Sequence, residues 1–591
     1  MQSKFVLCLC ALMFSIGSDG YGQNHVAYFR HIVDSLDNIQ PQAFRKIKTD
    51  GQAYTITVKT QQQFDDINDE ISKAIAAGSR NIKVKIESGV YHFQENHILR
   101  KNEQTDVAIS VVGKNAILTS DNDYGAEVEP GSPWQEMAFA DTLIEVADQE
   151  KKLCVIPYAN NLGNEEKANL SKVQITQWFR ASVYTVSHID EKGIYFVAPD
   201  LKWENGYGGR KGYNVNFDYL YRGKTPRFRL YDKTKERDCA ASRFINLENS
   251  SYKSFCVAGL CFKDNKSGNA LISMTNVEAR QIIVSDCTFE QIQSTIANVS
   301  GTNNVVFTHN AVRNTMGDEV RFLNNCVNVR VTDNMFVNCG QGIGNTFCVN
   351  CRESEYYVAG NTFRDFGYGA IGVGVWHGFA KQYSSKGIVE NNELFYSPEY
   401  FVECWKYTVM DSGAIYTWTQ NDDVIIRYNY IHDYEGAGDN RGIFCDDGAS
   451  NLKIYGNIVL NTPNGYSIDS RYIKDQKLMF RNNTNNFMAY NMVDNSILFM
   501  GYKEENRHCV KGQNFILRPK GASYRESKYE NLEYQDADVI IESNNMMFPK
   551  NSIGKEEMKR LKQNPYYKGM SSYLGKIKCK KYVRTNSNFC L

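Results

Sequence analysis

Four aspartates lie in three neighbouring segments of the chain, each of which also carries aromatic side chains. The segments read Asp411-Ser-Gly-Ala-Ile-Tyr416-Thr-Trp418, Arg441-Gly-Ile-Phe444-Cys-Asp446-Asp447-Gly448 and Gly465-Tyr-Ser-Ile-Asp469-Ser-Arg471. Two carboxyl groups held close together repel each other, so that one of them has a raised pKa. Such a pair suits cleavage of a glycosidic bond, because one group protonates the leaving oxygen and the other attacks or activates water. The candidate catalytic residues are therefore Asp411, Asp446, Asp447 and Asp469.

The three segments can be laid over one another as strands whose side chains alternate between two faces. The inward-facing residues would be Ile415, Ile443, Tyr466, Thr417, Cys445 and Ile468. Two outward columns would then form, one of Tyr416, Phe444 and Ser467, the other of Trp418, Asp446 and Asp469. Because stacked strands are about 4.8 Å apart, this alignment predicts that Asp446 and Asp469 are neighbours on a solvent-facing surface.

Aromatic and basic residues near these aspartates are candidates for substrate binding. Aromatic rings stack on flat ligands such as sugar rings, and arginine can hold hydroxyl or carboxylate groups. The candidates are Trp376, His377, Tyr416, Trp418, His432, Asp433, Arg441 and Arg471. Two of the acidic residues have an alternative structural interpretation, since Asp411 also suits a turn cap and Asp433 a turn that follows a repeated asparagine.

A short pattern recurs from about residue 255 onward: an apolar residue, two residues of any type, Asn, any residue, and a second apolar residue. Its asparagines are Asn310, Asn334, Asn361, Asn392, Asn429 and Asn457, with Cys287 in the same place one repeat earlier and Asn483 one repeat later. The intervals run from 23 to 37 residues, and the two longest, 31 and 37, lie between Asn361 and Asn429. A period in this range with two short β-like runs per unit indicates a solenoid.

The repeat predicts an all-β fold, a right-handed parallel β-helix in which each coil pairs with the coils above and below it. Asparagine at one fixed place suits a tight turn with left-handed geometry, and its amides can stack as a ladder. The two longest intervals predict long loops, and long loops on a rigid scaffold commonly carry function. They contain the segment with Asp411 and Trp376.

Segments outside the repeat divide the chain further. Residues 64–78 have the apolar spacing of an amphipathic helix that ends in Gly78, which we expect to cap the solenoid before the first strands at 82–86 and 89–93. Runs such as 193–197 and 215–220 indicate a small antiparallel β insertion. The predicted organisation is a signal peptide (1–22), an N-terminal cap with the first coils (23–129), a β-rich insertion (130–250), the main β-helix with the groove (251–505) and a C-terminal extension (506–591). Within the C-terminal extension, residues 555–563 are expected to form a helix.

Composition narrows the classes of function. The 591 residues include 67 Lys and Arg against 67 Asp and Glu, whereas a nucleic-acid-binding protein would normally show a basic surplus. The first residues are typical of a cleaved export signal: Lys4 is followed by the apolar run 5–16 and by small residues before Gln23. We therefore expect a periplasmic, surface or secreted protein without a membrane span.

Most of the 16 cysteines lie in apolar runs and are expected in the core, whereas Cys579 and Cys590 are candidates for a disulfide. The pair Cys348 and Cys351 is weak support for a metal.

Three of these segments together resemble the core of β-helix glycoside hydrolases such as families 141 and 120. They are Gly413-Ala-Ile-Tyr416, Tyr428-Asn429-Tyr-Ile-His-Asp433 and Gly442-Ile-Phe-Cys-Asp446-Asp447-Gly448-Ala-Ser-Asn451, and the resemblance spans roughly residues 255–490. It implies an exported bacterial enzyme that hydrolyses glycans, with Asp411 and either Asp446 or Asp447 as the carboxylates. The chain departs from that pattern at Ala414, where glycine is usual, and at Asp447, where family 120 members tend to have glutamate.

Two other functions remain open at this stage. A calcium-dependent β-helix polysaccharide lyase would use Asp446, Asp447 and Asp469 as calcium ligands and Arg471 as the base. A non-catalytic, glycan-binding β-helix would need no carboxylate pair. The favoured hypothesis is a monomeric hydrolase of an oligosaccharide or polysaccharide, which needs no metal or other cofactor because its side chains supply both protonation and attack.

Overall fold

The computed structural model describes the solenoid and the inserted sheet. The described residues are 31–42, 44, 52–93, 105–120, 135–136, 145–148, 153–156, 162–177, 180–197, 227–232, 243–265, 270–292, 294–315, 317–340, 346–375, 383, 385–397, 412–418, 421–434, 441–446, 449–460, 462, 464–469, 471–474, 477–480, 483–484, 486–493, 497–500, 506–507, 510–512, 515–518, 540–541 and 546–549. The predicted signal peptide, Cys579, Cys590 and the helix expected at 555–563 lie outside these residues.

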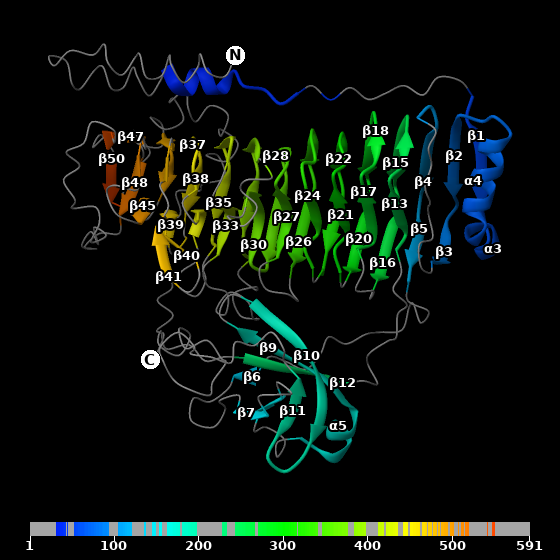
Figure 1. The fold of residues 1–591 in the computed structure, drawn as a ribbon, viewed down its shortest axis with the longest axis horizontal. Helices are drawn as coiled ribbons and strands as arrows, with labels where there is room; N and C mark the ends of the chain where they lie inside the picture. Colours follow the sequence, from blue (N-terminus) through cyan, green and yellow to red (C-terminus); the bar gives the residue numbers. More distant parts are fainter. Residues whose placement is uncertain are drawn as a thin grey trace.

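In the part of the chain that the structure describes, three parallel sheets form the walls of the solenoid (Figure 1), and their strands are counted within that part. The first sheet has 14 strands: β1 (Tyr54–Val58), β2 (Asn81–Ile86), β4 (Ala108–Gly113), β15 (Ser254–Ala258), β19 (Ile282–Ser285), β22 (Val305–Thr308), β25 (Val329–Thr332), β28 (Glu355–Ala359), β31 (Lys386–Glu390), β34 (Asp423–Arg427), β37 (Leu452–Tyr455), β43 (Phe487–Ala489), β47 (Val510–Gly512) and β49 (Ile540–Ile541).

The second sheet has 13 strands: β3 (Gly89–His92), β5 (Ala116–Thr119), β16 (Cys261–Asn265), β20 (Thr288–Ile292), β23 (Ala311–Arg313), β26 (Met335–Cys339), β29 (Thr362–Phe366), β32 (Glu393–Phe395), β35 (Tyr430–His432), β38 (Ile458–Leu460), β44 (Met492–Val493), β48 (Phe515–Arg518) and β50 (Met546–Pro549). The third sheet has 10 strands: β13 (Ile245–Glu248), β17 (Ile272–Thr275), β21 (Ala297–Ser300), β24 (Val320–Leu323), β27 (Phe347–Arg352), β30 (Gly369–Gly374), β33 (Gly413–Thr417), β36 (Arg441–Cys445), β39 (Asn464–Asp469) and β45 (Ile497–Met500).

Each coil visits the third, first and second sheets in turn, as β27, β28 and β29 do before β30 starts the next coil. Short strand pairs supplement the three walls: β14 (Ser251–Tyr252) with β18 (Glu278–Ala279), β42 (Asn483–Thr484) with β46 (Asn506–Arg507), and the antiparallel β40 (Arg471–Lys474) with β41 (Lys477–Phe480). The prediction of an all-β, parallel β-helix is confirmed.

Within the described residues, the insertion is a separate antiparallel sheet of seven strands outside the solenoid (Figure 1). Its order is β6-β12-β9-β10-β11-β8-β7, with β6 (Gln135–Glu136), β7 (Glu145–Asp148), β8 (Leu153–Ile156), β9 (Leu170–Gln177), β10 (Arg180–Ile189), β11 (Ile194–Val197), β12 (Arg227–Asp232) and one helix, α5 (Asn164–Asn169). The expected strand at 193–197 is therefore confirmed as β11, whereas 215–220 lies outside the described residues.

The N-terminal cap is helical, as the apolar spacing predicts, but it forms two short helices, α3 (Gln61–Asp65) and α4 (Ile67–Ala76). Both lie at the β1 end of the solenoid (Figure 1). Phe64 and Ile71 are buried there, and the ring of Phe64 stacks on Tyr91 with a centroid distance of 5.1 Å. The helices thus cover the apolar end of the core, which would otherwise be open to water. No helix among the described residues is long and apolar enough to span a membrane.

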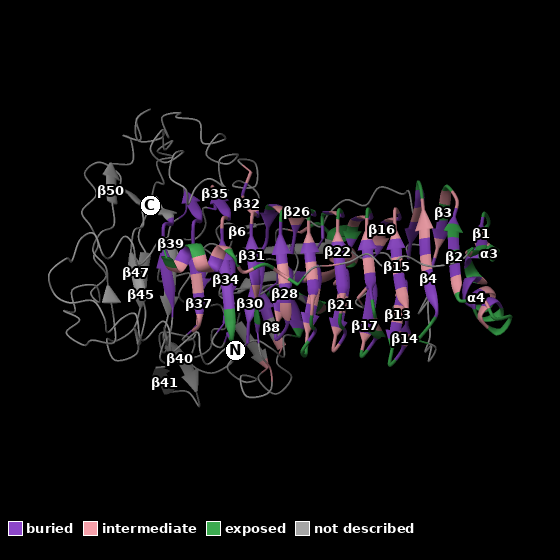
Figure 2. Cartoon of the chain, turned by 90° about the horizontal axis from the view of Figure 1, so that it is seen from above, coloured by how far each residue is buried: buried purple, intermediate pink, exposed green. Residues whose placement is uncertain are grey.

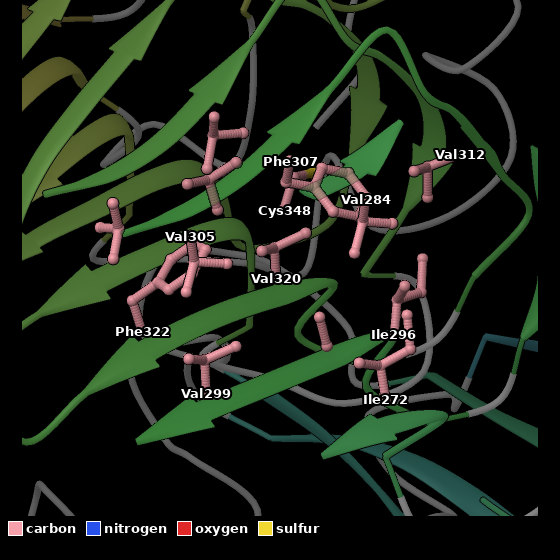
Figure 3. Packing of buried hydrophobic residues seen from close by; sticks show 14 of the residues in the cluster. Ile272, Val284, Ile296, Val299, Val305, Phe307, Val312, Val320, Phe322 and Cys348 are labelled. Atoms are coloured by element: carbon pink, nitrogen blue, oxygen red, sulfur yellow. The ribbon is translucent and has the colours of Figure 1, made fainter. Parts of the chain in front are cut away.

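The core runs the length of the solenoid and is built from inward-facing residues of all three sheets. Figure 3 shows Val299 and Phe322 of the third sheet, Phe307 of the first and Val312 of the second converging on it. Seen from above the first sheet, buried residues recur from coil to coil (Figure 2). Several cysteines are part of this core, as expected: Cys287, Cys326, Cys339, Cys348, Cys351 and Cys445 are buried and in the thiol form.

The predicted asparagine ladder is confirmed. At the turn between the first and second sheets, the Nδ2 group of each asparagine donates to the Oδ1 atom of the next, at 3.1 Å from Asn310 to Asn334 and 2.9 Å from Asn429 to Asn457. Asn334, Asn361 and Asn392 continue the same pattern. Cys287 occupies the ladder position one coil earlier, where its N–H donates to Asn310 at 2.9 Å.

Two details of the ladder differ from the prediction. The last ladder residue is Asn491, which accepts from Asn457 at 3.0 Å, and not Asn483, which lies in β42. The hairpin β40–β41 lengthens this coil and moves the ladder position along the chain. The left-handed backbone belongs to the residue before each asparagine, as at His309 (φ 55°) and Tyr428 (φ 56°). The asparagines thus contribute to the turn through the hydrogen bonds of their buried amides, and not through a left-handed backbone conformation.

A helix at residues 31–37 docks on the outside of the first sheet, far from the cap in space (Figure 1). Val33 and Leu36 are buried against a patch that includes Ile425 and Phe487. Below them lies Arg427, only 3% exposed, whose guanidinium binds Glu390 at 2.5 Å and the carbonyl oxygen of Leu36 at 2.8 Å. We call residues 31–39 the N-terminal strap.

Candidate active site

The strand alignment predicted for the three aspartate-bearing segments is confirmed in the third sheet. β33 pairs with β36 as Ile415 opposite Ile443 and Tyr416 opposite Phe444. β36 pairs with β39 as Phe444 opposite Ser467. Ile415 and Ile443 are fully buried in the core, so the alternation of a strand places Tyr416 and Phe444 on the outer face of the third sheet.

The aromatic residues on this face do not form the exposed platform that the sequence predicts. Tyr416 is 3% exposed and Trp418 6% exposed. They pack on each other with a centroid distance of 4.5 Å, and the ring of Phe347 lies edge-on at 5.8 Å from Tyr416 and 5.3 Å from Trp418. With Tyr368 and Phe444 these rings make an aromatic cluster, in which mutual packing removes the faces that a sugar would need.

The aromatic cluster fits because the intervening strand, β30, carries glycines at two of its outward positions, Gly372 and Gly374. Gly372 lies opposite Tyr416, and a Cβ atom there would come within 2.9 Å of Cγ of Phe347. At Gly374, where φ is +95°, a Cβ atom would come within 2.7 Å of the backbone nitrogen of Trp418. The missing side chains leave space for the Phe347 ring at Gly372 and for the close approach of the Trp418 backbone at Gly374.

Replacing Gly372 by alanine is expected to lower the free energy of unfolding by about 2 kcal/mol, because the new methyl group forces the Phe347 ring out of its place. Tryptophan fluorescence should change as well, since Trp418 packs on that ring. Chemical denaturation measures the first effect. In the double variant with Phe347→Ala the two costs should be less than additive; fully additive costs would contradict the contact.

Asp446 lies at the edge of the aromatic cluster and is partly exposed. Its carboxylate accepts a hydrogen bond from the hydroxyl group of Tyr416, and its backbone N–H donates to the carbonyl oxygen of Thr417 at 2.8 Å. A buried tyrosine thus fixes one carboxylate oxygen. This is the arrangement expected of a carboxylate that must hold a defined direction toward a ligand.

The other predicted catalytic residues can be placed only in part. The register of β36 and β39, with Cys445 opposite Ile468, brings Asp469 opposite Asp446 when it is extended by one residue. Arg471 begins β40, outside the three walls of the solenoid. Asp411, Asp447, Trp376 and His377 lie outside the described residues.

Arg441 contacts the aromatic cluster from the opposite end of β36 to Asp446. It opens β36, is 7% exposed, and its guanidinium carbon lies 3.9 Å from the centroid of the Phe444 ring. A cation over an aromatic face is favourable, and more so when both are removed from water. Arg441 thus closes the aromatic cluster at the end where β36 begins.

His432 and Asp433 are not brought together with Asp446. His432 ends β35 in the second sheet, where its ring stacks on Phe395 at 4.7 Å. Its Nδ1 atom lies 2.8 Å from Oδ2 of Asp433, and its Nε2 atom 3.5 Å from Oε1 of Glu393. Burial opposes the charged ring, but the two carboxylates outweigh it and raise the pKa of His432. The arrangement is that of an ion-paired wall residue.

A histidine whose pKa is raised in the folded state stabilises the fold below its ordinary pKa, and that contribution is lost as the pH rises through the raised value. We therefore expect His432 to contribute a fall in the melting temperature as the pH increases from about 6 to 8. The variant His432→Phe should remove this part of the slope in thermal melts across that range. The exposed His188→Gln variant serves as the control, and an unchanged slope in His432→Phe would contradict the assignment.

Four polar residues that sequence reasoning missed lie on the outer face of the third sheet, toward the β24 side of the aromatic cluster. They are Asp318, Arg321, Asn350 and Arg352, carried on or just before β24 and β27. Asp318 accepts the backbone N–H of Phe347 at 2.6 Å and the amide of Asn350 at 3.2 Å, and lies 3.3 Å from Nε of Arg321. Extending the strand alignment upstream would have placed Asn350 and Arg352, since they pair with Gly372 and Gly374.

Burial sets the charge state of this polar group. It raises the pKa of Asp318, although Arg321 and the Phe347 N–H act in the opposite direction. It also lowers the pKa of the Arg352 guanidinium, whose carbon lies 5.0 Å from the centroid of the Trp418 ring. Both groups are therefore poorly hydrated, and a charge brought to them by a ligand would interact strongly.

The outer face of the third sheet, from β24 to β36, thus carries an ordered polar track along an aromatic cluster. Arginine and carboxyl groups on it can bind hydroxyl or charged groups and can transfer protons, as the cleavage of a glycan requires. Within the described residues, no group of three or more His, Cys, Asp or Glu side chains is arranged to hold a metal ion.

Comparisons with known proteins find a likeness of fold. No family model and no curated protein matches the sequence. Among solved structures, one described as a glycoside hydrolase has a TM-score of 0.44 and 10% identity, covering 70% of this chain and 95% of that one. A complex of XylC with xylose has a TM-score of 0.37 and 7% identity, covering 80% of this chain and 82% of that one.

A third structure is the Gp54 tailspike of Acinetobacter baumannii bacteriophage AP22 in complex with A. baumannii capsular saccharide. Its TM-score is 0.18 at 9% identity, covering 90% of this chain and 79% of that one. At these identities and TM-scores the likeness carries no argument about activity. The resemblance to families 141 and 120 therefore stays a prediction.

Proposed function

We propose that this chain is an exported enzyme that hydrolyses glycosidic bonds in a complex oligosaccharide or polysaccharide. The observation that carries the proposal is the position of Asp446: a partly exposed carboxylate, fixed by the Tyr416 hydroxyl, on an outer face that also bears Arg441 and Arg352. A partly exposed carboxylate contributes little to the stability of a fold, so a purely structural role would not account for this position.

The second carboxylate in this proposal is Asp469, with Asp411 and Asp447 as alternatives. Positions opposite each other on neighbouring strands are about 4.8 Å apart, which is close to the separation of the two carboxyl groups in retaining glycosidases. A pair of this kind would share its charge unequally, so that one group is protonated and can act as the acid. The reaction needs no cofactor, because both proton transfer and attack come from side chains.

The test is hydrolysis of a panel of plant and host glycans by the purified full-length chain, with reducing ends and released sugars quantified. We expect new reducing ends from at least one glycan, at a rate that a chelator does not change. Release without dependence on Asp446 would contradict the assignment of the site, and no release from any member would contradict the proposal.

A β-eliminating polysaccharide lyase is the second candidate, favoured by one observation. Arg352, held over the Trp418 ring on this face, would neutralise the carboxylate of a bound uronate, as β-elimination requires. A lyase would leave unsaturated sugar ends that absorb ultraviolet light, and its activity would depend on calcium if Asp446 and Asp469 bound the ion. The same panel separates the two candidates, because hydrolysis gives no such absorbance.

A further inference from the structure

We propose that Arg352 and Arg321 form a subsite for the anionic group of an acidic glycan, a carboxylate or a sulfate ester. This inference rests on the proposed function, since it names the class of glycan that the outer face of the third sheet would take. The two arginines lie on neighbouring strands, β27 and β24. Both side chains are partly exposed, so a ligand can reach them.

Arg352 is held in place without using its whole guanidinium group. Its Nε atom donates to the side-chain oxygen of Asn350 at 3.0 Å, and its guanidinium carbon lies over the Trp418 ring. Among the residues that the structure describes, no carboxylate lies within ion-pair distance of Arg352 and no hydrogen bond is made by its two terminal nitrogens. An arginine so oriented presents a ready pair of donors, which suits a planar or tetrahedral anion.

Arg321 widens the subsite toward the preceding coil. It pairs in register with Asn350, and its Nε atom lies 3.3 Å from Asp318 but makes no hydrogen bond in the described part of the chain. Asn350 contributes the link between the two arginines, since its amide donates to Asp318 and its oxygen accepts from Arg352. The result is a preorganised row of donors along one face.

The charges around this row favour an anion over a neutral sugar. Asp318 and Glu353 are the carboxyl groups that face Arg352, and burial disfavours the ionised form of both. The two guanidinium groups, by contrast, remain charged at any ordinary pH. The protein's own acids therefore neutralise the two arginines only in part, and a bound carboxylate or sulfate would supply the remaining negative charge.

The subsite lies away from the proposed point of cleavage. Arg352 is on β27 and Asp446 follows β36, with β30 and β33 between them, so the two are about 14 Å apart along the solenoid. The anionic group thus belongs to a distant unit of the same glycan chain. This position implies that the enzyme binds a polymer across several coils.

The experiment measures binding by calorimetry in the full-length Asp446→Asn variant, so that no turnover interferes. The probes are an oligosaccharide of galacturonic acid, its carboxyl-reduced neutral counterpart, and a sulfated chondroitin oligosaccharide. We expect at least one acidic probe to bind roughly tenfold or more tightly than the neutral one, as a charge-assisted hydrogen bond would give. Preference for the uronate or for the sulfated probe identifies which anion the subsite takes.

In the same background, Arg352→Gln should reduce the affinity for the acidic probe to the neutral level, and Arg352→Lys should retain part of it. The matched control is Arg364→Gln, an exposed arginine of the second sheet that pairs with Asp365. Melting temperatures of all variants show whether each is folded. Equal binding of acidic and neutral probes, or no binding of any, overturns the subsite, as does an unchanged affinity in Arg352→Gln.

These outcomes are distinct from a failure of the proposed function. Acidic probes that bind through Arg352, together with no cleavage of any member of the glycan panel by the wild-type chain, would support the subsite and contradict hydrolysis. A neutral glycan that is cleaved in an Asp446-dependent way, with no preference for its acidic counterpart, would support hydrolysis and overturn the subsite.

Discussion

Asp446→Asn is expected to lower kcat/KM on a cleaved glycan by roughly a thousandfold or more, because the carboxamide can neither transfer the proton nor attack. The fold should be unaffected. Asp446 is partly exposed, and the amide oxygen of asparagine can still accept the hydrogen bond from the Tyr416 hydroxyl. Initial rates at several substrate concentrations, together with thermal melts, measure both properties.

The matched control for that variant is Asp423→Asn. Asp423 is an exposed carboxylate at the start of β34 in the first sheet, where it pairs with Lys453 at 2.7 Å. Its replacement should leave both activity and melting temperature nearly unchanged. If Asp446→Asn retained activity near that of the wild type, the catalytic role would pass from Asp446 to Asp411.

Asn429→Ala is expected to lower the free energy of unfolding by about 4 kcal/mol, since it leaves several buried polar groups without partners. The Asn429 amide donates to the carbonyl oxygens of Val389 and Arg427 and to Asn457. Its oxygen accepts from both the backbone and the side chain of Asn392. Denaturant titration followed by circular dichroism measures the loss.

Asn298→Ala is the matched control, because Asn298 lies on the outward side of β21 and is partly exposed. We expect a change within about 0.5 kcal/mol for this variant. Similar losses in the two variants would mean that the ladder asparagines contribute no more than surface residues, which would contradict the structural role assigned to them.

Much of the fold is predictable because the coils of a solenoid share one geometry, so the same sequence pattern recurs in each coil. The repeated asparagine identifies one turn, and alternation around Ile415 and Ile443 gives the strand register. The late shift of the ladder from Asn483 to Asn491 was not predictable from the repeat. Both residues fit the local pattern, and only the formation of the β40–β41 hairpin decides between them.

The candidate site is less predictable, because strand alternation tells which face a residue occupies and not whether that face is covered. Tyr416 and Trp418 lie on the predicted face, yet the Phe347 ring packs on both of them and buries them. The ring has room to do so because β30 has a glycine beside it. Asp318 could not be found at all from the sequence. It lies outside a strand, and its role depends on contacts with Phe347 and Asn350 one coil later.

The N-terminal strap has a consequence for the order in which the chain folds. In a solenoid each coil contacts its neighbours, so folding can spread from one coil to the next. The strap is different, because Leu36 binds Arg427 across 391 residues of sequence and Asp37 binds Tyr455 across 418. It has no docking surface until the coils around β34 and β37 exist, and contacts between such distant segments form slowly. The first residues of the described chain are thus among the last to reach their native positions.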